Sequence, residues 1–124
     1  MVMSSLLLSA AFVLCDSGVR TACVVDGDTF WLHGEKVRIA DINAPETSRP
    51  ACDAEAVRGA AATRRLTTLL NQGPIELLAG PRDRDRYGRL LRIVTRDGHS
   101  LGQQLVAEGL AERWQGRRKS WCTA

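Results

Sequence analysis

Carboxylate, amide and guanidinium side chains gather at three places in this 124-residue sequence. The first is Asp26-Gly27-Asp28-Thr29, where two carboxylates share one tight turn. Two carboxylates on one turn are able to bind a hard divalent cation, one directly and the other through water. Asp-Gly is also one of the commonest pairs in hairpin turns, so this segment alone favours a turn that binds nothing.

The second place is the segment from Arg38 to Glu46, RIADINAPE. Asp41, Asn43 and Glu46 put three oxygen-bearing side chains at the exit of one predicted strand. Strict alternation along a strand directs Arg38 to the face opposite Asp41 and Asn43. Arg38 and Asn43 therefore address one site only if the chain bends or bulges between them. Taken alone, the same residues fit a solvated strand face and an ordinary loop carboxylate.

The third place is the segment 82–96, RDRDRYGRLLRIVTR, which holds six arginines in fifteen residues. Asp83 and Asp85 favour an exposed loop whose charges partly neutralise each other. Arg89 differs from its neighbours, because it follows Gly88 and begins a predicted strand whose backbone geometry is fixed.

The elements that must position these residues are short strands joined by tight turns. Apolar runs with β-branched residues, bounded by Asp-Gly or Gly, predict five strands. These cover Val19–Val25, Thr29–His33, Lys36–Ile42, Ile75–Ala79 and Leu90–Arg96.

Two helices are predicted between and after these strands. Asp53 is positioned to cap the first, Gly73-Pro74 ends it, and Gly59 within it indicates a point of close packing. Ser100 to Gln103 fits a capping box at the start of the second, which runs to Gly109. The order is that of an α+β domain, a five-stranded OB-fold β-barrel with helices after strands three and five.

Taken in order, the three segments resemble the staphylococcal nuclease (thermonuclease-like) family. The resemblance rests on VVDGDTFWL, VRIADINAPE and DRYGR followed by LGQQLVAEGLA, and it covers roughly residues 19–114. It implies an OB-fold barrel and calcium-dependent hydrolysis of phosphodiester bonds in DNA and RNA with little sequence specificity. It further implies products that carry 3′-phosphates.

The resemblance also implies a role for each matching residue. Arg38 and Arg89 would clamp the phosphate, and Glu46 would orient or deprotonate the attacking water. Tyr87 would lie near the bound nucleotide. The Ca²⁺ site would be formed by Asp28, Asn43, the backbone carbonyl of Ala44 and, in the outer shell, Asp26.

Asn43 departs from the family pattern, which usually has a second metal-binding aspartate there. An amide oxygen still ligates calcium, but the site loses one negative charge, so we expect weaker calcium binding. Asp41 is a candidate to compensate if the chain bends toward the site.

Composition excludes several classes of protein. Charged residues make up 25% and hydrophobic ones 44%, which excludes a disordered or collagen-like chain. No apolar run approaches the roughly 20 residues of a membrane span. The net charge of +3 lies in the tail, because residues 1–112 carry 13 basic and 14 acidic side chains. The tail, RWQGRRKSWCTA, is compatible with phosphate binding and with a merely solubilising role.

The termini and cysteines bear on the compartment. Residues 1–18 fit a signal peptide, or a hydrophobic N-terminal segment that packs on the domain formed by 19–124. Four cysteines agree with two disulfides, which have three possible connectivities, or with four buried thiols. Cys15–Cys23 would close a short loop and Cys52–Cys122 would pin the tail. We therefore expect a periplasmic or secreted protein, monomeric and without a stable membrane span.

Three hypotheses follow for function. The first is a sugar-nonspecific nuclease that acts on DNA and RNA. The second is a catalytically weak or inactive OB-fold module that binds nucleic acid or a partner. The third is a disulfide-stabilised envelope domain, which does not explain why Arg38, Glu46 and Arg89 occur together.

Overall fold

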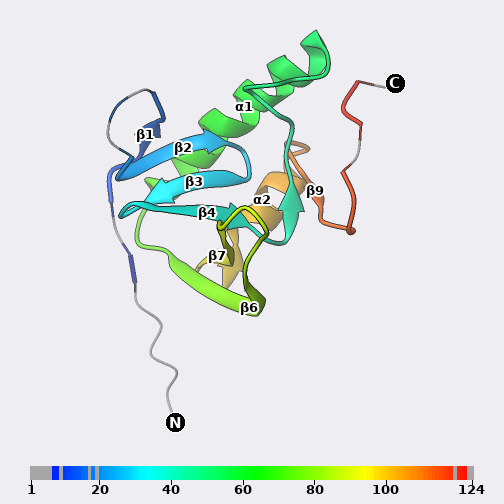
Figure 1. The fold of residues 1–124 in the computed structure, drawn as a ribbon. Helices are drawn as coiled ribbons and strands as arrows, with labels where there is room; N and C mark the ends of the chain where they lie inside the picture. Colours follow the sequence, from blue (N-terminus) through cyan, green and yellow to red (C-terminus); the bar gives the residue numbers. More distant parts are fainter. Residues whose placement is uncertain (1–6, 9, 17, 19, 119, 123–124) are drawn as a thin grey trace.

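The computed structural model describes residues 7–8, 10–16, 18, 20–118 and 120–122. A mixed sheet curls around the core, and two helices pack beside it (Figure 1). The sheet runs in the order β1-β2-β3-β4-β7-β6, with β8 paired to β7. Its strands are β1 Val13–Leu14, β2 Ala22–Asp26, β3 Thr29–Leu32, β4 Glu35–Ile39, β6 Glu76–Arg84, β7 Leu90–Arg96 and β8 His99–Ser100.

The helices are α1 (Asp53–Leu70) and α2 (Leu101–Ala107). A second, two-stranded sheet pairs β5 (Ile42–Asn43) with β9 (Glu112–Arg113). The predicted α+β class is confirmed, with β2, β3, β4, β6 and β7 as the five expected strands and a helix after the third and fifth. β4 pairs with β7 in parallel, which places Arg38 opposite Leu91 and brings the first half of the site beside the second.

Several local predictions were wrong. The fourth predicted strand does not end at Ala79, because β6 continues to Arg84 and takes in the start of the segment expected to be an exposed loop. The third strand does not run to Ile42, because the chain turns at 40–41 between β4 and β5. Cys52 rather than Asp53 is the N-cap of α1, and no side chain caps that helix. Ser100 does cap α2 by accepting the backbone N–H of Gln103, but the Gln103 carboxamide bonds Asp41 instead of reaching back.

The N-terminal segment packs on the domain where it is described. Phe12 is buried, and its ring meets the ring of Phe30 edge-on, with centroids 5.7 Å apart. The Asn71 carboxamide bonds both the backbone N–H and the carbonyl of Phe12, at 2.7 and 2.9 Å. Leu8 forms an antiparallel bridge with Ile75 at the start of β6, so the segment lies between β6 and β2. Residues 1–6, 9 and 17 of the predicted signal region lie outside the described residues, and removal of that region stays a prediction.

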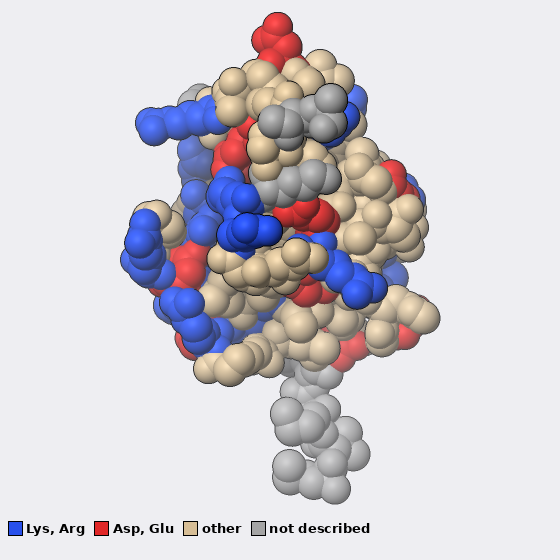
Figure 2. Space-filling model, turned by 90° about the vertical axis from the view of Figure 1, so that its right-hand side faces the viewer, with Lys and Arg blue, Asp and Glu red and all other residues tan. Residues whose placement is uncertain are grey.

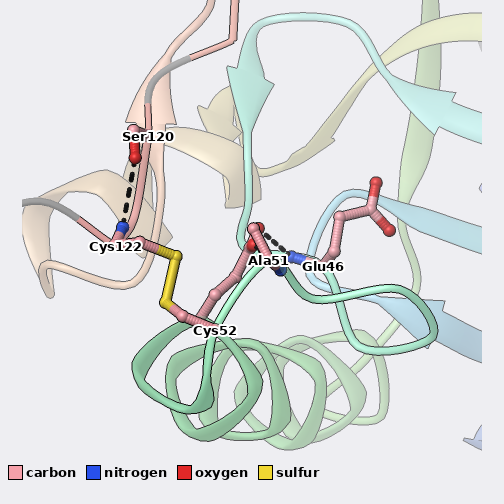
Figure 3. The surroundings of a disulfide bond; sticks show 6 residues. Glu46, Ala51, Cys52, Ser120 and Cys122 are labelled. Carbon is pink, nitrogen blue, oxygen red and sulfur yellow. Dashed lines mark hydrogen bonds between the residues drawn. A yellow bond between two sulfur atoms is a disulfide. The ribbon is translucent and has the colours of Figure 1, made fainter.

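Two disulfides fasten the termini, in the pairs named from the sequence. Cys15–Cys23 joins the N-terminal segment to β2, and Cys52–Cys122 joins the start of α1 to the C-terminal tail (Figure 3). Neither α1 nor α2 combines the length and apolar character that a transmembrane helix needs, among the residues described.

Candidate active site

The β2–β3 turn holds two buried carboxylates. Asp28 accepts the backbone N–H of Ala44 through Oδ2 at 2.9 Å and the hydroxyl of Thr29 through Oδ1 at 3.0 Å. Asp26 Oδ1 accepts the backbone N–H of Asp28 at 3.2 Å. A Cβ on Gly27 would lie 2.7 Å from the Ala62 Cβ in α1 and 2.8 Å from the Ala44 Cβ, so only glycine lets the turn sit here. The close packing fixes the turn, and with it both carboxylates, against α1 and the exit of β5.

The turn at 40–41 brings Arg38 to the same place. Its Nη1 donates to the carbonyl oxygens of Ile39 and Ile42, and its Nη2 lies 3.5 Å from Asp28 Oδ2. The bend required for Arg38 and Asn43 to address one site is therefore present. Arg38 is buried and points much of its fork at backbone oxygens, and its guanidinium lies 5.7 Å from the centre of the Trp114 ring.

Asp41 does not join this group. Its Oδ2 accepts the Ser100 hydroxyl at 2.7 Å and the Gln103 carboxamide at 3.1 Å. Its Oδ1 would lie 2.7 Å from a Cβ on Gly102. Asp41 thus anchors the start of α2, and it does not replace the carboxylate that Asn43 lacks.

Asn43 is buried at the end of β5 with its side-chain amide unpaired among the described residues. The residue is 1% exposed, and neither its Oδ1 nor its Nδ2 has a hydrogen-bond partner in the part of the chain that the structure describes. Leaving such a group buried and unpaired costs about 1–3 kcal/mol. Asn43 and Glu46 line the same cavity of ≈ 540 Å³.

The carboxylates of Asp26, Asp28 and Glu46 lie close enough together to influence one another. Burial raises the pKa of Asp26 to about 8, and the negative charges of Asp28 and Glu46 add to the effect. Within the described residues no three His, Cys, Asp or Glu side chains form a metal cluster. The donor set is instead two carboxylates and one unpaired amide oxygen, which suits a hard divalent cation such as Ca²⁺. For Ala44 the structure shows an amide bonded to Asp28, and the ligand role of its carbonyl stays a prediction.

Glu46 is positioned by α1. A Cβ on Gly59 would lie 2.6 Å from the Glu46 carbonyl oxygen, so the predicted close contact at this glycine is present. The buried Glu55 carboxylate accepts the backbone N–H groups of Ala51 and Glu46, at 2.7 and 3.0 Å, and these bonds lower the pKa of Glu55. Figure 3 shows Glu46 extending away from the disulfide at the end of this loop. Glu55 was not predicted as a site residue, because nothing in the sequence indicates that its carboxylate bonds the loop from Glu46 to Ala51.

Arg89 and Tyr87 lie across a second cavity from Arg38. All three line a space of ≈ 840 Å³ between the β6–β7 connection and the tail. Arg89 donates Nε to Asp85 Oδ2 at 2.7 Å, and its guanidinium lies 5.5 Å from the centre of the Tyr87 ring. Tyr87 is 69% exposed and therefore available for stacking.

Arg118 completes the site and was not among the predicted residues. Its Nη1 lies 2.6 Å from Glu46 Oε1. Cys52 lies six residues after Glu46, so the proposed Cys52–Cys122 pairing was the one signal that brings the tail here. In Figure 2, Lys and Arg side chains gather along one side of this face, and acidic side chains lie between them.

The structure thus brings five of the predicted residues to the two cavities, Asn43 and Glu46 to the first and Arg38, Arg89 and Tyr87 to the second. Asp26, Asp28, Arg38, Asn43, Ala44 and Glu46 gather around the β2–β3 turn, and Arg89 and Tyr87 lie on the other side of Arg38.

Comparison with known proteins gives a consistent result. A family model described as "Staphylococcal nuclease homologue" matches residues 36–122. Endonuclease YncB of Bacillus subtilis (strain 168) is 39% identical over 92 residues, which are 70% of this chain and 43% of that protein. The SPbeta prophage-derived endonuclease YokF of the same strain is 39% identical over 92 residues, 70% of this chain and 31% of that protein. The chain therefore spans less than half the length of these curated relatives.

Proposed function

Because this chain belongs to the staphylococcal nuclease family, we propose that it is a nuclease that hydrolyses phosphodiester bonds of DNA and RNA. The names of the two Bacillus relatives support an endonuclease. The observation that carries the proposal is the buried, unpaired Asn43 amide, which lines the same cavity as Glu46 and directly precedes Ala44, whose N–H bonds Asp28.

Hydrolysis of a phosphodiester needs groups that stabilise the developing negative charge and a group that activates the attacking water. Attack on a phosphodiester builds negative charge on the phosphoryl oxygens, and guanidinium groups fixed beforehand stabilise that charge. Arg89 lines the larger cavity, and Asp85 accepts a hydrogen bond from its Nε. Arg38 lines the same cavity and is held by the backbone carbonyls of Ile39 and Ile42. Glu46 orients the attacking water and accepts its proton, a contribution of about 10²–10⁴-fold.

Ca²⁺ is the proposed cofactor. Asp28 and Asn43 would bind it, with Asp26 in the outer shell and the Ala44 carbonyl as a further ligand. When bound, the ion supplies positive charge next to the phosphate. The chain's own part is to keep Asp28 in place through Ala44 and Thr29, and to leave the Asn43 oxygen unpaired.

Substrate range and setting are part of the same proposal. Tyr87 is exposed beside the cavity and offers a stacking face to any base, which suits low sequence specificity. The two disulfides favour a periplasmic or secreted protein. We further propose a monomer and products with 3′-phosphates.

The experiment is an assay of purified protein on single-stranded DNA and RNA, with Ca²⁺ and with a chelator in its place. Hydrolysis with Ca²⁺ that stops with the chelator supports a nuclease. Binding without hydrolysis under both conditions contradicts it and leaves the nucleic-acid-binding module. Arg89→Ala is the matched active-site variant, and it should lose most of the hydrolysis while the thermal transition stays within a few degrees.

A further inference from the structure

The tail carries an arginine between the two cavities. Among the described residues that line either cavity, only Arg118 borders both. One cavity holds Glu46 and Asn43, and the other holds Arg38 and Arg89. A nucleic-acid strand that occupies both cavities must therefore pass Arg118.

The tail is fastened on both sides of this arginine. Upstream, β9 pairs with β5, and the Trp114 backbone N–H donates to the Asp41 carbonyl at 3.0 Å. Downstream, Trp121 is buried and Cys122 is bonded to Cys52. The segment is thus a strap attached at both ends, and it is not a loose solubilising end. Figure 1 shows the tail running along the right-hand side of the domain.

Arg118 also has donors to spare. By comparison, the Nη1 of Arg38 already donates to two backbone carbonyls, and its Nη2 faces Asp28. In the described structure the hydrogen bond of Arg118 is the one from Nη1 to Glu46, and its side chain is 52% exposed. A guanidinium carries five N–H donors, so most of this fork remains for an anion.

We propose that Arg118 binds a phosphate of the nucleic-acid strand next to the scissile one, and that the Cys52–Cys122 disulfide holds it there. This inference rests on the proposed function for the identity of the strand. A phosphate that draws the guanidinium toward itself also releases the Glu46 carboxylate. Arrival of the strand thereby frees the group that must act on water.

The test compares Arg118→Gln with Arg117→Gln. Both remove one charge from the same tail, but Arg117 is exposed and lines neither cavity. Binding of fluorescent single-stranded DNA is measured with a chelator present, so that cleavage plays no part. Arg118→Gln should weaken binding about 10-fold and lower the salt slope by about 1, while Arg117→Gln stays within about 2-fold.

Equal losses in the two variants, or unchanged binding by Arg118→Gln, would overturn the inference. So would faster cleavage by Arg118→Gln in Ca²⁺, because the strap would then be a block. If the unmutated chain binds but never cuts, the proposed nuclease fails while the comparison of variants still decides this inference. If it does not bind at all, both fail.

A second pair of variants tests the disulfide. Cys52→Ser with Cys122→Ser should reproduce the binding loss, and Arg118→Gln added to it should cost nothing more. Cys15→Ser with Cys23→Ser removes the other disulfide and should leave binding unchanged. Full additivity of Arg118→Gln with loss of Cys52–Cys122 would show that the disulfide does not act through Arg118.

Discussion

Asp28 Oδ2 accepts the backbone N–H of Ala44 at 2.9 Å, and this bond joins the β2–β3 turn to the exit of β5. The two residues are 16 positions apart in the chain. The bond places Asn43, just before Ala44, and Glu46, two residues after it, next to the turn that holds Asp26. The arrangement of the candidate active site depends on this contact.

The missing charge at Asn43 gives the first prediction. Asn43→Asp adds a third carboxylate beside Asp26 and Asp28, so calcium should bind roughly tenfold more tightly. Without calcium the same variant should unfold at a lower temperature, because the new charge is buried beside like charges. Calorimetric titration with Ca²⁺ measures the affinity.

Gln115→Glu serves as the control for Asn43→Asp, since it adds the same charge at an exposed position of the tail. It should leave calcium affinity unchanged. An Asn43→Asp variant with wild-type affinity would mean that Asn43 does not face the ion.

The raised pKa of Asp26 predicts how stability depends on pH. The pKa is about 8 in the folded protein, against 3.8 for an ordinary aspartate side chain. Between these two pH values the folded state therefore binds more protons than the unfolded state. The free energy of unfolding of the metal-free protein should therefore fall as pH rises from about 4 to about 8. Calcium, which favours the ionised carboxylate, should reverse much of this loss.

The measurement is urea unfolding in chelator across that pH range, for the unmutated chain and for Asp26→Asn. The variant lacks the titrating group, so its stability should change less with pH. Identical pH profiles for the two proteins would contradict the environment assigned to Asp26.

Gly59 predicts a link between α1 and Glu46. Gly59→Ala puts a methyl group 2.6 Å from the Glu46 carbonyl oxygen, so either the loop or the helix must move. We expect a stability loss of about 1–3 kcal/mol and a fall in hydrolysis larger than the unfolded fraction explains. Gly80→Ala is the matched control, because its Cβ would have nothing within 4 Å. Full activity per folded molecule in Gly59→Ala would contradict the link.

Phe12 tests whether the N-terminal segment belongs to the folded domain. Phe12→Ala removes a buried ring that packs on Phe30, and it should cost about 3–5 kcal/mol. Val13→Ala, at a position 62% exposed, should change stability by less than about 0.5 kcal/mol. Thermal unfolding of both variants measures this, and mass analysis of the mature protein shows whether the segment is retained. Equal stability of the two variants would exclude Phe12 from the core.

The sequence predicts those features that local patterns determine. Alternation and turn residues were enough for the five strands, the helix after the third, and the Ser100 cap of α2. The turn at 40–41 was not evident, because Lys36–Ile42 has the apolar character of one strand. The fate of Asp41 depends on α2, about sixty residues further along.

Arg118 shows the same limit more sharply. Its contact with Glu46 spans 72 residues, and nothing in the neighbouring RRK run distinguishes it from Arg117. Only the Cys52–Cys122 pairing tied the tail to this part of the chain. Likewise, the packing of Leu8 and Phe12 on the domain depends on Ile75 and Asn71, which are far away in sequence.

The most direct test of the account is the rate at which Glu46→Gln hydrolyses single-stranded DNA in the presence of Ca²⁺. Glu35→Gln is the control, since Glu35 is a half-exposed carboxylate paired with Arg84. We predict that Glu46→Gln hydrolyses DNA at a rate about 10²-fold or more below that of the unmutated chain. It should still bind DNA, and Glu35→Gln should hydrolyse DNA at close to the unmutated rate. Hydrolysis by Glu46→Gln at the unmutated rate would contradict the central claim that this carboxylate acts on the attacking water.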